Sequence, residues 1–321
     1  MKLDNLPPFY QVDENIAQAL QNEEPVVALE STVITHGLPY PQNKNLALDM
    51  EAEVRLGGAA PATIAVVDGV IRIGVEAQQL ERLARGGEVH KISVRDFAPA
   101  ILKGWSGGTT VAGTLLAAQA AGIWVFATGG IGGVHRSISA EEGREAARAW
   151  LSADISADLP QLARTPMIVV CAGAKAILDL PATLEYLETW GVPVVGYQTD
   201  EFPAFYSTSS SLKVSARADT PAEVARLARF HWDLGMKSAI LVAQPPPAEF
   251  ALPFETVGRE IDRALREAQE QRIRGQQVTP FLLSRVAELS GGASLQANLA
   301  LLRNNARLAA QIARAMAALP R

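Results

Sequence analysis

The stretch Met167-Ile168-Val169-Val170-Cys171-Ala172-Gly173-Ala174-Lys175 is an apolar run that ends on a lysine. A run this apolar leaves no side for water, so it predicts a strand buried on both faces of a sheet. Similar short runs alternate along the chain with longer alanine-rich segments of helical period, which is the pattern of an α/β protein. We therefore predict a three-layer α/β/α fold, with helices above and below a central sheet.

The predicted elements alternate over the whole length of the chain. Strands are expected at 26–29, 63–68, 70–74, 124–128, 167–171, 194–197 and 239–243. Helices are expected at 43–56, 110–121, 181–190, 221–234, 254–271 and 295–319. Asp68 and Gly69 separate two of the strands and favour the positive φ angles of a tight hairpin turn, so the sheet should be mixed. The sequence contains no internal repeat and no long linker, which predicts a single domain over residues 1–321.

Composition limits the classes of partner. The 321 residues are 48% hydrophobic and 20% charged, which is enough to bury a substantial core. A formal net charge of -5 argues against a nucleic-acid or anionic-membrane surface, so any anionic partner should be small. The single cysteine, Cys171, cannot form an internal disulfide, which favours a reducing cytoplasm. The sequence shows neither a signal-peptide core nor the roughly 20 apolar residues that cross a bilayer.

Lys175 is the first candidate for catalysis, because the buried strand would deliver it to a cleft. A lysine among apolar neighbours loses hydration of its ammonium form, so its pKa falls and a neutral amine becomes available to attack a carbonyl. That chemistry is the formation of a Schiff base. The alternative is a lysine whose side chain extends past the strand end into solvent.

Other polar residues lie near the ends of predicted strands, where open α/β sheets place their ligands. Glu30 is either a proton donor with a raised pKa or a strand-end carboxylate paired with a basic neighbour. The glycine-containing segment 104–111 is either a phosphate-binding loop or an ordinary turn capped by Thr109. Lys91 can hold a phosphate as a point charge, although surface lysines are common.

Four glycines follow Thr128 and indicate that the backbone approaches another group closely. Either a tight internal turn or a bound anion accounts for them, and the flanking Thr128, His135 and Arg136 favour the anion. Further along, Asp154 and Asp158 stand four residues apart and would share one face of a helix. They either bind a hard divalent cation together with waters or mark an exposed acidic helix start.

Taken together, these segments resemble the pseudouridine-5'-phosphate glycosidases. The resemblance runs from about residue 10 to residue 318 and is carried by blocks of unusual composition in the same order. These blocks are ALESTVITHGLPYPQN (28–43), GGTTV (107–111), ATGGIGGVHR (127–136), DISADL (154–159), VVCAGAK (169–175), TLEYLET (183–189) and DEFPAFY (200–206). The resemblance implies reversible cleavage of pseudouridine 5'-phosphate, with water, into uracil and ribose 5-phosphate. It also implies a homotrimer.

The bond broken in this reaction joins C1' of ribose to C5 of uracil, so no heteroatom leaves with the base. The family's catalytic lysine matches Lys175; it attacks C1' as the ribose ring opens and gives an imine. The family's proton donor matches Glu30. Its manganese ligand matches Asp154, with few protein ligands and several waters. The family's substrate contacts fall on Lys91, Val111, Thr128, His135, Ser156, Ala157, Asp158 and, facing the uracil, Asn298.

The chain departs from the family pattern at residues 137–153, where the family has a shorter acidic connector. This insertion can act as a lid, alter a subunit contact or move Asp154. Segment 207–211 also differs from the usual continuation, and Asn298 by itself would be interpreted as a helix surface residue. Two other functions stay open: a different Schiff-base lyase acting on a phosphorylated sugar, and a non-catalytic phosphosugar-binding protein.

Overall fold

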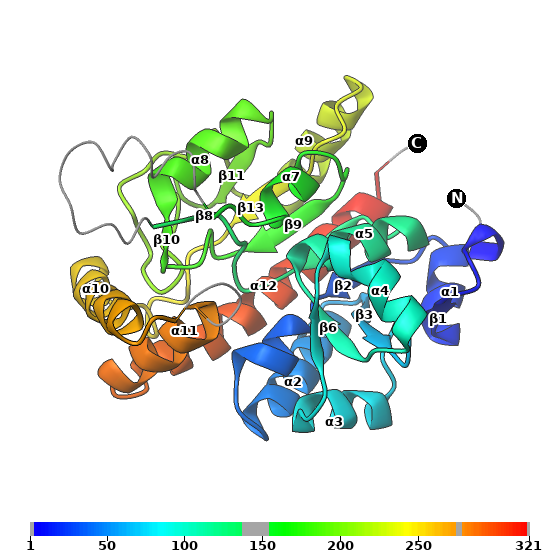
Figure 1. Cartoon of the computed structure of the whole chain (residues 1–321). Helices are drawn as coiled ribbons and strands as arrows, with labels where there is room; N and C mark the ends of the chain where they lie inside the picture. Colours follow the sequence, from blue (N-terminus) through cyan, green and yellow to red (C-terminus); the bar gives the residue numbers. More distant parts are fainter. Residues whose placement is uncertain (1–2, 137–153, 274–277, 320–321) are drawn as a thin grey trace.

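The computed structural model describes residues 3–136, 154–273 and 278–319, so the insertion at 137–153 lies outside the described residues (Figure 1). The strands are β1 (Tyr10–Val12), β2 (Val26–Leu29), β3 (Ala60–Val67), β4 (Val70–Ile73), β5 (His90–Ile92), β6 (Gly107–Thr109), β7 (Val125–Ala127), β8 (Val134–His135), β9 (Ile168–Cys171), β10 (Leu178–Asp179), β11 (Val194–Tyr197), β12 (Ala216–Ala218) and β13 (Ile240–Ala243). The helices are α1 (Glu14–Gln21), α2 (Gln42–Leu56), α3 (Ala77–Arg85), α4 (Phe97–Lys103), α5 (Val111–Ala121), α7 (Asp158–Leu162), α8 (Leu180–Thr189), α9 (Pro221–Asp233), α10 (Phe254–Glu270), α11 (Val278–Leu289) and α12 (Ala293–Ala317).

The main sheet joins eleven strands of the described residues, with the central path β1-β4-β3-β2-β7-β9-β13-β11-β12. From β3 to β12 every neighbouring pair on this path is parallel. β3 and β4 are antiparallel, and the turn between them places Asp68 at φ 51° and Gly69 at φ 77°. β6 extends the sheet beside β3, and β5 pairs with β6. The predicted mixed sheet and the hairpin are therefore confirmed.

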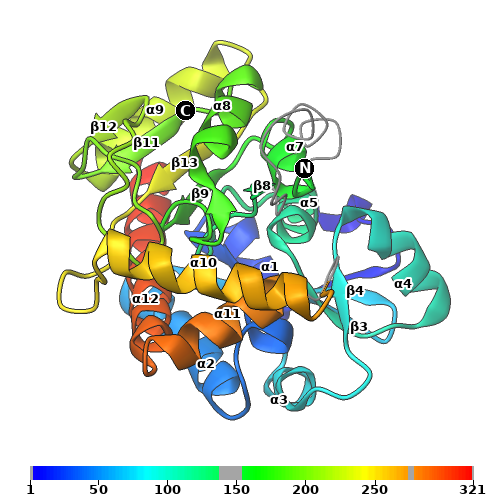
Figure 2. The same cartoon turned by 60° about the vertical axis from the view of Figure 1, so that its left-hand side comes forward.

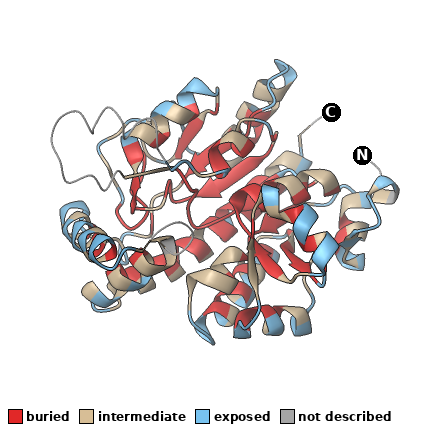
Figure 3. Cartoon of the chain, viewed as in Figure 1, coloured by how far each residue is buried: buried red, intermediate tan, exposed pale blue. Residues whose placement is uncertain are grey.

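The central strands are buried on both faces, as their apolar sequences predict. Every residue of β2, β9 and β13 is buried, and Figure 3 shows burial concentrated in the strands. α12 crosses the sheet in contact with β2, β7 and β9 and packs against α2 and α9. α5 contacts β2, β3 and β4 and packs against α7. Figures 1 and 2 show helices on both sides of the sheet, which confirms the layered architecture.

The six predicted helices correspond to α2, α5, α8, α9, α10 and α12, with ends within two residues of the expected positions. The strands of two or three residues outside the central core were not predicted, because so short a segment shows no periodicity. In the three described ranges, no helix combines the length and the apolar character needed to span a membrane.

Candidate active site

The carboxyl ends of three neighbouring parallel strands build the centre of the candidate site. In the register of the sheet, Leu29 of β2 pairs with Ala127 of β7, which in turn pairs with Val170 of β9. Glu30 and Thr128 are the next residues of their strands, so they emerge side by side at one edge of the sheet. This edge is where open parallel sheets bind ligands.

Glu30 is held inside the protein with a hydroxyl partner. Only 6% of the residue is exposed, and one carboxylate oxygen accepts a short hydrogen bond from the Thr128 hydroxyl. Burial raises the pKa of Glu30 above its usual range; the charge of Lys175 and the bond from Thr128 oppose that rise. A carboxyl that keeps its proton nearer neutral pH is suited to act as a general acid.

Lys175 follows β9 by four residues and reaches the same edge. Its backbone N–H donates to the Ile131 carbonyl at 3.1 Å, which fixes the loop against the glycine-rich segment. Lys175 is half-buried, and its side chain interacts electrostatically with Glu30, Lys91 and His135. The charge of the amine therefore acts on the predicted proton donor.

Two further predicted residues enter the same electrostatic cluster. Burial lowers the pKa of Lys91, and the neighbouring charge of Lys175 lowers it further, while Asp158, Glu30 and Asp154 oppose the change. Burial also lowers the pKa of His135, against the opposing charge of Asp154. Bases with depressed pKa values beside a carboxyl with a raised one are typical of sites that move protons.

Asp158 joins the glycine-rich segment to the start of α5. One carboxylate oxygen accepts from the backbone N–H of Ala112 and the other from that of Gly132, both at 2.8 Å. The Ser156 hydroxyl accepts from the Asp158 backbone N–H at 3.2 Å. Asp158 is only 5% exposed, and Val111, the first residue of α5, is buried beside this junction. Ala157, between Ser156 and Asp158, is exposed.

The glycines that follow Thr128 are explained by internal packing. A Cβ on Gly130 would lie 2.7 Å from the Phe205 ring, and one on Gly132 would lie 2.2 Å from the Ser156 hydroxyl. A Cβ on Gly133 would lie 2.3 Å from the Thr183 hydroxyl. The predicted close approach is therefore present, but the groups approached are the protein's own.

Arg136 has partners within the protein itself. Its guanidinium donates to the backbone carbonyl of Leu178 at 3.1 Å and to that of Ala176 at 3.3 Å, and it pairs with Asp262 on α10 at 3.3 Å. These carbonyls belong to the loop that follows Lys175. Arg136 thus holds that loop in place, and the signal in the sequence was only its position next to the glycines.

The segment 104–111 differs from the sequence interpretation of a turn capped by Thr109. Residues Gly107–Thr109 form strand β6, and the helix cap is Thr110, whose hydroxyl accepts from the Gly113 backbone N–H at 3.2 Å. Thr109 instead lies fully buried beneath the strand ends, donating to the Ile64 carbonyl at 2.7 Å. The segment contains a strand that pairs with β3 and β5, and it leads into a capped helix.

Asp154 and Asp158 do not share a helix face as the spacing predicted. Asp154 precedes α7 and is exposed, whereas Asp158 starts α7 and is buried. Among the residues that the structure describes, no three His, Cys, Asp or Glu side chains are grouped to hold a metal ion. A single exposed carboxylate binds a hard cation only with help from waters. The described residues therefore do not form a chelating site of three such side chains.

α12 carries two buried asparagines that bear on the site prediction. Asn298 is 9% exposed, so it is a buried residue and not a surface one. Asn305 lies two turns later on the same face of the helix. Its side-chain amide donates to the Thr128 carbonyl at 2.8 Å. Sequence reasoning missed Asn305, because an amide inside a long helix carries no signal of a contact 177 residues away.

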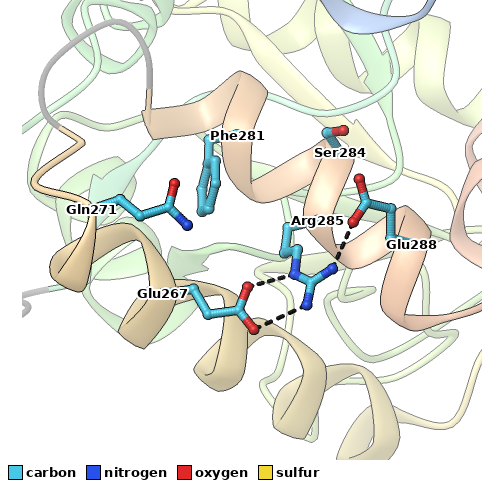
Figure 4. Close-up of a pocket in the computed structure, with 6 residues that line it drawn as sticks. All are labelled: Glu267, Gln271, Phe281, Ser284, Arg285 and Glu288. Atoms are coloured by element: carbon cyan, nitrogen blue, oxygen red, sulfur yellow. Dashed lines mark hydrogen bonds and ion pairs between the residues drawn. The ribbon is translucent and has the colours of Figure 1, made fainter.

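A separate pocket lies between α10 and α11, and none of the site residues line it (Figure 4). Its central Arg285 is bound by Glu267 on α10 and by Glu288 one turn further along α11. The guanidinium is already matched by carboxylates, so this pocket offers no free charge to an anionic ligand.

Comparison with known proteins shows the family of this chain. A family model for indigoidine synthase A like proteins matches residues 15–315. A pseudouridine-5'-phosphate glycosidase of Solibacter usitatus is 53% identical over 303 residues, which cover 94% of this chain and 98% of the relative. The protein of that name from Escherichia coli is 49% identical over 309 residues, 96% of each chain.

Two solved structures share the whole fold. The prealnumycin C-glycosynthase AlnA, in complex with ribulose 5-phosphate, has a TM-score of 0.86 and 39% identity over 98% of each chain. An indigoidine synthase A (IdgA)-like protein from Thermotoga maritima has a TM-score of 0.83 and 32% identity over 95% of each chain. The resemblance carried by the sequence blocks is thereby confirmed, and the chain belongs to the family of indigoidine synthase A-like proteins and pseudouridine-5'-phosphate glycosidases.

Proposed function

We propose that this chain is an enzyme that reversibly cleaves pseudouridine 5'-phosphate, with water, into uracil and ribose 5-phosphate through a Schiff base on Lys175. The observation that carries the proposal is the half-buried Lys175 in electrostatic interaction with the buried Glu30 at one edge of the sheet, in a chain of this family. An amine nucleophile beside a carboxyl that keeps its proton is the pair that this reaction needs.

The proposed reaction opens the sugar before it breaks the carbon-carbon bond. The neutral Lys175 nitrogen attacks C1', and the ring oxygen leaves with a proton supplied by Glu30. The nitrogen, now an ammonium, returns one proton to the Glu30 carboxylate and so regains its lone pair. That lone pair forms a C=N bond to C1' while the electron pair of the C1'–C5 bond moves to C5 of uracil, which takes the proton from Glu30. Water adds to the resulting iminium ion, which releases ribose 5-phosphate and restores the lysine.

The other predicted residues bind and orient the substrate in this proposal. Lys91 and His135 hold the phosphate and sugar together with Val111, Thr128, Ser156 and Ala157. Asp158 acts mainly by fixing the backbone of Gly132 and Ala112 around the substrate, since both of its oxygens accept backbone N–H groups. The buried Asn298 presents its amide to the uracil.

The direct test follows free uracil and ribose 5-phosphate during incubation with pseudouridine 5'-phosphate, with uridine 5'-phosphate as the control substrate. Borohydride added with ribose 5-phosphate should reduce the imine and leave a sugar adduct on the peptide that contains Lys175. Lys175→Arg should abolish turnover and adduct, whereas Lys103→Arg, at the exposed end of α4, should keep both. An unmodified Lys175 in the wild type would refute the mechanism.

A second candidate is a Schiff-base lyase or synthase that joins a phosphorylated sugar to a different base or aglycone. The AlnA structure favours it, because that C-glycosynthase shares the fold over 98% of each chain and binds ribulose 5-phosphate. This candidate predicts a borohydride-trapped sugar at Lys175 but no release of uracil from pseudouridine 5'-phosphate. A non-catalytic phosphosugar-binding protein predicts binding of ribose 5-phosphate without an adduct.

Three further properties are part of the proposal. A divalent metal, Mn2+ in the family resemblance, is proposed at Asp154 with waters; calorimetric titration with Mn2+ should give weaker binding in Asp154→Ala. A homotrimer is proposed and is measured by light scattering. A cytoplasmic location is proposed because the buried Cys171 is a free thiol, which suits a reducing compartment.

A further inference from the structure

Asn305 connects α12 to the backbone behind both proposed catalytic residues. It is fully buried, and its amide donates to the Thr128 carbonyl at 2.8 Å and, more weakly, towards the Gly129 carbonyl at 3.5 Å. The Gly129 carbonyl also accepts from the Ala172 backbone N–H at 2.8 Å, in the segment that leads to Lys175. A single side chain thus contacts the strand end where β7 and β9 meet the site.

The packing around Asn305 makes this contact rigid. A Cβ on Gly129 would lie 3.2 Å from Leu302, one turn before Asn305, so the strand end already presses against the helix. The Oδ1 atom of Asn305 is buried and has no hydrogen-bond partner among the described residues. An orphaned buried acceptor is unfavourable, so replacing Asn305 with an apolar residue removes one unfavourable group along with the useful donor.

We propose that Asn305 is a positioning residue that fixes the Thr128 backbone, and thereby keeps the Thr128 hydroxyl directed at the Glu30 carboxylate. Both backbone groups of Thr128 are hydrogen-bonded. The Thr128 N–H donates to the Val170 carbonyl on β9, and the Thr128 carbonyl accepts from the Asn305 amide on α12. With both bonds present the Thr128 backbone is fixed, so the Cα–Cβ bond keeps the direction from which the hydroxyl reaches Glu30. This inference rests on the proposed function only for the role of Glu30 as proton donor.

The consequence for Glu30 has a definite sign. The hydrogen bond from Thr128 lowers the pKa of Glu30, against the rise caused by burial. Loss of Asn305 should therefore loosen that bond and raise the pKa of Glu30 further. The charged groups that face Glu30, namely Lys175, Asp158 and Lys91, are untouched by the substitution.

The experiment compares Asn305→Leu with Thr128→Val and with the double variant. Ionisation of Glu30 is followed by the infrared band of its protonated carboxyl, identified as the band that Glu30→Gln lacks, so no turnover is required. Asn305→Leu should keep this band to higher pH, and Thr128→Val should do so at least as strongly. Because Asn305 acts through Thr128, the double variant should titrate like Thr128→Val alone.

Activity and stability provide the second readout. Asn305→Leu should lower kcat on the order of 10- to 100-fold with a smaller change in KM. Ile312→Val, also fully buried on α12, is the matched control and should keep the wild-type kcat and Glu30 titration. If Asn305→Leu does not fold, Asn305→Ser, too short to reach Thr128, takes its place. A Glu30 titration unchanged in the folded Asn305 variant overturns the inference, whereas a wild type that releases no uracil overturns only the proposed function.

Discussion

Replacing Asp158 with alanine tests whether the junction between the glycine-rich segment and α5 stabilises the fold. The substitution removes two charge-assisted hydrogen bonds of 2.8 Å and leaves the backbone N–H groups of Ala112 and Gly132 without their acceptor. Hydrogen bonds to a charged group contribute roughly 1.5–3 kcal/mol each, so the loss should be about 3–6 kcal/mol. The favourable interaction of the carboxylate with the start of α5 is lost as well.

The matched control is Asp154→Ala, which changes the same residue type four positions earlier at an exposed site. Exposed substitutions usually change the free energy of unfolding by less than about 0.5 kcal/mol. Urea unfolding should therefore separate the two variants, and a loss of 3 kcal/mol corresponds to a melting temperature lower by roughly 6–12 °C. Equal unfolding midpoints for Asp158→Ala and Asp154→Ala would refute the structural role of Asp158.

Three further substitutions have defined outcomes. Burial raises the pKa of Glu30. The wild type should therefore lose stability relative to Glu30→Gln as the pH rises from the ordinary carboxyl pKa to the raised one. Melting temperatures of both proteins measured across pH check this, and a difference in melting temperature that stays constant with pH contradicts it. Gly133→Ala places a Cβ 2.3 Å from the Thr183 hydroxyl and should destabilise by about 1–3 kcal/mol in urea unfolding. If Gly133→Ala lowers the free energy of unfolding less in a Thr183→Ala background, the contact with the Thr183 hydroxyl is the cause. An equal loss in both backgrounds would exclude that contact as the cause. Arg136→Ala removes the hydrogen bonds to the backbone carbonyls that follow Lys175, so it should lower kcat more than it raises KM in the uracil-release assay. An unchanged kcat would mean that this segment keeps its position without Arg136.

The central strands and the positions of Glu30 and Lys175 near strand ends could be predicted from the sequence, because both rest on local signals. A fully apolar run of four or five residues is typical of a strand buried on both faces of a sheet, and parallel strands bring their carboxyl ends to one edge. The side chains directly after those strands must then converge. Thr128, which follows β7, was placed at the site for the same reason.

The contacts that support those side chains could not be predicted, because they join residues far apart in the sequence. Arg136 reaches Asp262 on α10, and Asn305 reaches Thr128 from the last helix. A polar residue in a helix looks the same in sequence whether it faces solvent or another layer. Glycines are equally ambiguous, since Gly132 shows close approach without showing whether the neighbour is a ligand or Ser156.

The direction of the pKa changes separates the candidate active site from the ion pairs that only stabilise the surface. In the α10–α11 pair, hydrogen bonding lowers the pKa of Glu267 and raises that of Arg285, so each group becomes harder to neutralise. At the strand ends the signs are reversed: burial raises the pKa of Glu30 and lowers that of Lys91. Each of these groups is thereby brought closer to exchanging its proton near neutral pH, which an acid-base site requires and a structural ion pair does not. Because desolvation is the largest cause of both changes, burial at this edge of the sheet is what sets Glu30 and Lys91 apart from the surface ion pairs.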